Sequence, residues 1–179
     1  MILGLPCGRI LFYYLLMTSI GKNEIQENDR WAAAIECLRQ GRNAQAFLLL
    51  SEPKPEKGPA EHFNLGLCYF RAGDFSAAVS CFEKAQQLLK AFSAPQGRSA
   101  AENSETYLKL AAEQIMAKSY LNPMNADFCT LFPKIAEQAV LLCMIGAYQQ
   151  KGLIEQARRL SSALAGPQFE AYKKTLHDL

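Results

Sequence analysis

Cysteine, histidine and acidic side chains carry most enzymatic and metal-binding chemistry, and in this sequence they form none of the patterns that such chemistry requires. The six cysteines include no CxxC pair, which removes the usual spacing of a zinc site, and are Cys7, Cys37, Cys68, Cys81, Cys129 and Cys143. The two histidines, His62 and His177, are expected to be structural or solvated. The sequence contains no nucleophile elbow, phosphate-binding loop or dinucleotide-binding motif, and its carboxylates are scattered singly among Lys and Arg. We therefore expect no catalytic residue, no metal and no cofactor, and no enzyme.

The composition narrows the class of partner. The chain has 179 residues, half of them apolar, with 19 basic and 17 acidic side chains and a net charge of +2. Nucleic-acid binding needs a clustered excess of Lys and Arg, so the near-neutral balance favours a protein or peptide as partner. Most cysteines lie inside apolar helical patterns, where a reduced thiol packs as a small hydrophobic group. A reducing, cytoplasmic compartment is therefore expected.

The first 21 residues form a separate segment whose role is open. Residues 10–17 are an uncharged apolar run, shorter than the roughly 20 residues that a bilayer-spanning helix needs. One interpretation is an extension before a true start at Met17, or a helix docked on the rest of the protein. The other is a signal or membrane anchor, with Arg9 as its only preceding cation, in which case the protein would be exported or anchored.

After Gly21 the apolar residues follow a helical period almost throughout, and an all-α fold is expected. A Pro-rich linker over 52–58 and a loop over 93–99 interrupt the pattern. The caps and periodicity predict helices over residues 30–40, 43–51, 59–72, 75–92, 101–121, 133–151, 153–164 and 167–179.

The most specific pattern lies in residues 59–92, where small and large apolar residues alternate at fixed offsets. Gly66 and Ala78 must be small for two antiparallel helices to approach closely, and larger side chains fill the space around that contact. The repeat-packing residues are Leu65, Gly66, Tyr69, Ala78, Phe82 and Ala85. This pattern resembles the tetratricopeptide repeat, a 34-residue helix-turn-helix unit. It departs from that repeat at His62, where the repeat has Trp, and at Lys90, where it has Pro.

Weaker copies of the same turn occur on both sides. Gly41 and Ala46 precede Gly73 and Ala78 by 32 residues, and the turn before Ala157 repeats the pattern again. We expect three helical hairpins at about 27–53, 59–92 and 133–165, with a divergent helix over 101–121 and a C-terminal capping helix. Residues 22–179 would then form one tetratricopeptide-like α-solenoid.

The helix over 60–72 carries a second apolar stripe besides its packing seam. In proteins that resemble this one, the first helix of each repeat lines the concave surface, which implies a peptide-binding groove of Phe63, Asn64, Leu67, Phe70 and Arg71. The alternative is that neighbouring helices, or residues 10–20, cover these rings as ordinary core.

The resemblance also argues against one kind of ligand. Some members of this family hold a C-terminal carboxylate with a clamp of Lys, Asn and Arg. Only Asn64 stands at a clamp position, because Trp31 and Ile35 occupy the sites where the clamp needs Lys and Asn.

These observations favour a noncatalytic scaffold or chaperone-type module that binds a peptide or helix of another protein on its concave face. The alternative is a structural or regulatory subunit of an obligate complex, for example one associated with secretion, whose apolar stripe is a permanent interface. A domain cut from a larger enzyme is a more distant alternative. A homo-oligomer is left open, and contact with a membrane is expected only through residues 1–20.

Overall fold

The computed structural model describes residues 27–53, 56–92, 106, 109–110, 113, 117–164 and 166–178. Its α-helices are α2 (Glu27–Arg39), α3 (Asn43–Ser51), α4 (Pro59–Arg71), α5 (Phe75–Phe92), α7 (Ala126–Leu131), α8 (Pro133–Gln150), α9 (Ile154–Ser161) and α10 (Glu170–His177). Two 3-10 turns, η2 (Ser119–Leu121) and η3 (Pro167–Phe169), complete the regular structure of this part, which contains no strand. The all-α helical repeat fold expected from the sequence is confirmed.

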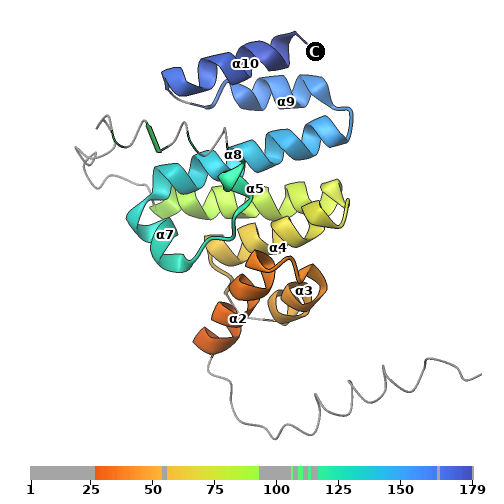
Figure 1. The fold of residues 1–179 in the computed structure, drawn as a ribbon, viewed down its shortest axis with the longest axis vertical. Coiled ribbons are helices and arrows are strands. Elements are labelled where there is room, and N and C mark those ends of the chain that lie inside the picture. Colours follow the sequence, from red (N-terminus) through yellow and green to blue (C-terminus); the bar gives the residue numbers. More distant parts are fainter. Residues whose placement is uncertain are drawn as a thin grey trace, which may run out of the picture.

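The helices stack in chain order. In Figure 1 the layers run along the long axis, from α2 and α3 at the bottom through α4, α5 and α8 to α9 and α10 at the top. Three hairpins, α2–α3, α4–α5 and α8–α9, form this stack, and α5 packs directly against α8. Residues 93–132 are therefore an insertion in the sequence between two hairpins that contact each other directly.

The same turn joins the two helices of each hairpin. Gly41, Gly73 and Gly152 have φ angles of 72°, 81° and 71°, in the left-handed region that glycine adopts without a steric penalty. In the second hairpin the Gly73 N–H donates to the Phe70 carbonyl at 3.2 Å, and the next N–H donates to the Tyr69 carbonyl at 3.0 Å. The other two glycines make the same pair of bonds, which together satisfy the last carbonyls of a helix.

The close approach of α4 and α5 depends on a missing side chain. A Cβ built on Gly66 would lie 2.5 Å from Cε1 of Phe82 and 3.2 Å from Cβ of Cys81. Ala78 and Ala85 of α5 are completely buried. Leu65 and Tyr69 are half-buried on the side of the first hairpin, where Tyr69 meets Phe47 edge-on at 5.4 Å between ring centroids.

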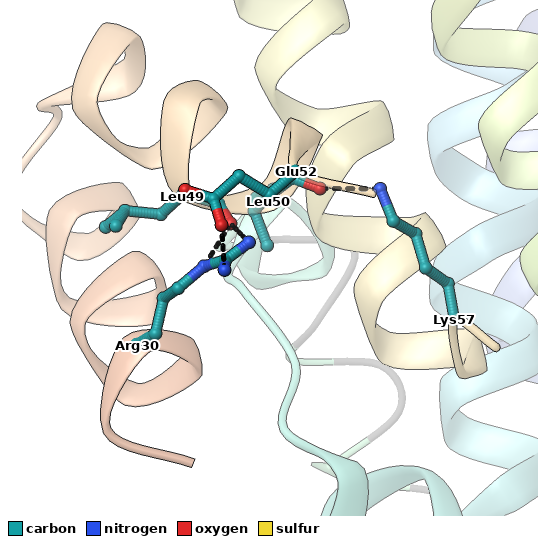
Figure 2. A network of polar contacts seen from close by, with 5 residues as sticks. All are labelled: Arg30, Leu49, Leu50, Glu52 and Lys57. Carbon is teal, nitrogen blue, oxygen red and sulfur yellow. Dashed lines mark hydrogen bonds and ion pairs between the residues drawn. The ribbon is translucent and has the colours of Figure 1, made fainter. Parts of the chain in front are cut away.

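Two cationic side chains, Arg30 and Lys57, cap the C-terminal end of α3 by donating hydrogen bonds to its last carbonyls, as Figure 2 shows. The Arg30 guanidinium donates from Nε and Nη2 to the Leu49 carbonyl, both at 3.0 Å, and pairs with Glu52. Lys57 donates to the Leu50 carbonyl at 2.7 Å. These carbonyls belong to the last turn and have no acceptor role within the helix, so the two side chains satisfy them and complement the negative end of its dipole.

The sequence-based boundaries need correction after α5. The helix expected over 101–121 does not reach its predicted end, because Lys118 has a φ of 52° and residues 119–121 form η2. Helix α7 was not predicted, and the helix expected over 167–179 begins as η3. Of residues 101–116, only 106, 109–110 and 113 are described, and all four are helical. The segment 1–21 lies outside the described residues. Among the described helices, none has the length and apolar character to cross a bilayer.

Candidate functional site

The second apolar stripe of α4 does not face an open groove. Phe63 and Leu67 are completely buried in the cluster that α4 and α5 share with Val140 and Cys143 of α8. Phe70 is half-buried and meets Phe75 edge-on at 5.5 Å between ring centroids. The expectation that these side chains line an accessible surface is wrong for Phe63 and Leu67, because α5 and α7 pack against α4 and residues of α8 complete the same core. Phe70 is partly covered by Phe75 and lies near Gly146 of α8.

Asn64 contacts a backbone instead of solvent. Its side-chain amide donates from Nδ2 to the Met124 carbonyl at 2.7 Å, and its Oδ1 accepts from the Met124 N–H at 2.9 Å. One buried amide thus satisfies both backbone polar groups of a residue 60 positions away. Both groups would cost free energy if they were buried without partners, so this pair fixes where Met124 lies.

Arg71, the last residue of α4, links three parts of the chain. Its Nη1 donates to the Leu38 carbonyl at 2.8 Å and to Oδ1 of Asn43 at 3.0 Å, which connects α4 to the turn of the first hairpin. Its Nη2 donates to the Leu121 carbonyl at 3.0 Å. Arg71 and Asn64 therefore lie on one side of α4, called the inner face below, and both bind the inserted segment.

Residues 119–125, the inner-face segment, are held by backbone bonds and by apolar packing. The Cys143 thiol of α8 donates to the Tyr120 carbonyl at 3.3 Å. Met124 is buried in the α4–α5–α8 cluster, and Tyr120 and Leu121 pack against it. Asn125 ends the segment by accepting from the Phe128 N–H at 2.7 Å, which caps the N-terminus of α7.

Comparison with known families recognises the helical hairpin that carries Asn64 and Arg71. The family model of the tetratricopeptide repeat matches residues 59–90, which span α4 and most of α5. Residues 59–90 therefore form a repeat of the tetratricopeptide type, within a fold of all-α helical repeats. Neither the curated proteins nor the solved structures give a significant match to the chain. The repeat indicates a protein–protein interaction module, and a protein partner is the class of ligand that the family supports.

The buried thiols and His62 of the described part of this repeat protein have shifted pKa values. Burial raises the pKa of Cys68 and Cys129 to about 11, and it raises the pKa of Cys143 further, so these thiols stay protonated. Burial, and after it the charges of Lys57 and Lys84, lowers the pKa of His62. No cluster of three His, Cys, Asp or Glu side chains that could hold a metal occurs among the described residues.

The residues that sequence reasoning missed all belong to the insertion. Asn64 and Arg71 were singled out on α4, but their partners at Leu121 and Met124 were not. Pro123 and the capping residue Asn125 are local signals for an irregular segment followed by a helix start. No local signal tells where such a segment docks.

Another part of the insertion is exposed and apolar. Leu131 at the end of α7 is 69% exposed, and the next residue, Phe132, is 49% exposed. The Phe132 ring meets that of Phe128 at 5.7 Å between centroids. This pair lies outside the residues expected to bind a partner.

Proposed function

We propose that this chain is a noncatalytic protein-interaction module that binds an extended segment of another protein on the inner face of its repeat array, as a scaffold or chaperone-type protein. The observation that carries the proposal is the pair of hydrogen bonds between Asn64 and the backbone of Met124. These bonds, and the bond from Arg71 to the Leu121 carbonyl, are made to backbone atoms. Every peptide has such atoms, so the same side chains could bind a peptide of another protein.

In this proposal the buried thiols of the described core serve packing. The buried thiols have raised pKa values, and His177 is exposed two residues before the C-terminus of the sequence. A binding role needs none of the activated groups that an enzyme requires.

Selection of displayed random peptides on the immobilised full-length chain tests the proposal. Peptides that bind the inner face should lose most of their affinity for the Arg71→Ala variant, because that change removes the donor to the peptide backbone. The Arg159→Ala variant is the matched control, since Arg159 is an exposed arginine on α9. Selected peptides that bind all three proteins equally well would contradict binding on the inner face.

A second candidate is a subunit of an obligate complex. The exposed pair Leu131 and Phe132 favours it, because adjacent exposed apolar side chains of this size are common in protein interfaces. Most of the apolar stripe first expected to form this interface is buried. The interface would instead be formed by Leu131, at the end of α7, and by Phe132. In that case the protein purified from its source would have the mass of a fixed complex, and the double variant Leu131→Ser, Phe132→Ser would release it as a single chain. A single-chain mass for the unaltered protein would exclude this candidate.

A further inference from the structure

The inner-face segment has the contacts of a bound peptide. Asn64 pairs with both backbone groups of Met124, and this pairing does not depend on the Met124 side chain. Arg71 binds the carbonyl three residues earlier, at Leu121. Asn64 both donates to and accepts from Met124, 60 residues away, and Arg71 donates to Leu121, 50 residues away. The array therefore uses the same side chains on its own chain that it would use on a partner.

Residues 119–121 of this segment form the 3-10 turn η2, and the backbone after it is extended. Asn122 has φ −76° and ψ 143°, and Asn125 has φ −104° and ψ 168°. Between them Pro123 removes one backbone donor, so no N–H is left to satisfy at that position. The apolar side chains on either side of it, Leu121 and Met124, provide the packing.

The entry to the segment is strained. Lys118 has a φ of 52°, the left-handed conformation, which costs a residue with a side chain on the order of 1 kcal/mol. Lys118 is also exposed, so its side chain gains nothing from burial there. The contacts of Asn64, Arg71 and Met124 hold the segment in place against this strain.

We propose that the inner face of α4 is a binding site for an apolar peptide that is extended after one 3-10 turn, and that residues 119–125 occupy it as an internal competitor that a partner must displace. The proposal rests on the proposed function and specifies the ligand and its regulation. The ligand has an aliphatic residue whose carbonyl meets Arg71 and, three positions later, an unbranched apolar residue whose backbone pairs with Asn64. A partner must first displace residues 119–125, and the free energy of this displacement reduces its binding free energy. The isolated protein therefore binds its partner more weakly than a protein with an open site would.

A peptide with the sequence of residues 118–127, labelled with a fluorophore, is the probe for this competition. It is added to the full-length chain, and binding is followed by fluorescence anisotropy. In the wild-type chain the site is filled, so the probe should bind weakly. In the Met124→Asp variant a carboxylate replaces a methionine that is 5% exposed, so the internal segment should leave its place. The probe keeps its methionine and should bind this variant at least about tenfold more tightly.

A milder variant and two controls complete the experiment. Leu121→Ser changes a half-buried side chain and should also raise probe affinity, even if Met124→Asp fails to fold, as circular dichroism would reveal. Leu48→Asp places a charge on an exposed leucine of α3 and should leave probe binding at the wild-type level. A probe that itself carries the aspartate should bind neither variant.

The outcomes separate this inference from the proposed function. Equal probe affinity for the wild type and both variants, or no binding to any folded variant, would overturn the internal competition. If displayed peptides that depend on Arg71 are nevertheless found, the proposed function stands without it. If the probe binds the opened variants but no displayed peptide binds the chain, the internal competitor is supported and a role in peptide capture is refuted.

Discussion

The contact between Gly66 and Phe82 tests how α4 and α5 pack. Substituting Gly66 by alanine adds a methyl group whose carbon would lie 2.5 Å and 2.7 Å from two carbons of the Phe82 ring. The ring cannot swing aside freely, because it is completely buried and packs at 5.6 Å between centroids against Phe63. The helices must therefore separate, or the ring must leave its preferred rotamer.

Two opposing effects decide the size of the change. Alanine favours a helix interior over glycine by about 1 kcal/mol, which stabilises the variant. Overpacking a filled core costs about 1 to 3 kcal/mol, and the short distances at Gly66 place the cost in the upper part of that range. The net loss in unfolding free energy should be about 1 to 2 kcal/mol, measured by urea denaturation followed by circular dichroism. For a chain of this size each kcal/mol lowers the melting temperature by about 2 to 4 °C.

A second glycine gives the matched control. Gly146 also lies inside a helix, α8, but a Cβ there would be 3.6 Å from the nearest atom of Phe70, an ordinary contact distance. Gly146→Ala should therefore keep the gain in helix propensity and stabilise the protein by up to about 1 kcal/mol. Effects of the same sign at Gly66 and Gly146 would refute the close packing of α4 on α5.

Three further predictions concern ionisation and capping. Because the pKa of His62 is lowered in the folded state, the unfolded chain binds its proton more readily, so stability should fall as the pH drops through about 6.5. His62→Gln should flatten this dependence in urea titrations at pH 7.5 and 5.5, whereas an unchanged slope would assign it to other groups. Alkylation at pH 8, mapped by mass spectrometry, should label the half-buried Cys81 well before the completely buried Cys143, and the reverse order would contradict the core arrangement. Arg30→Ala should lower the unfolding free energy by about 1 to 2 kcal/mol and speed amide hydrogen exchange in α3. Arg30→Lys should recover only part of this stability, because it loses one of the two donors to the Leu49 carbonyl. Full recovery by lysine would show that charge alone matters.

The repeat turns could be predicted because their chemistry is local. Each of Gly41, Gly73 and Gly152 follows the last residues of a helix and precedes a small residue at a fixed distance, and the structure gives all three a positive φ. The requirement for a glycine lies within a few residues of the glycine itself. A single sequence therefore suffices to find such turns.

The inner-face segment could not be predicted, because its partners are distant in the sequence. Asn64 is conspicuous as a polar residue in an apolar helix, but nothing around it points to Met124. The second apolar stripe of α4 is compatible with an open groove or with a covered core, and it does not show that residues 119–125 dock beside it. Helix α7 has six residues, too few for a periodic pattern to identify it.

The linkers that join successive hairpins differ greatly in length, although α5 packs directly on α8. Seven residues, 52–58, join α3 to α4, whereas 40 residues, 93–132, join α5 to α8. The entropy of closing a loop grows with the logarithm of its length, so the longer connection costs about 1.5 kcal/mol more. During folding the α4–α5 hairpin forms from neighbouring residues, and its docking on α8 must wait for the more distant encounter. We therefore expect the α5–α8 interface to be the last large contact to form, which makes it the boundary between two cooperative folding units of the array.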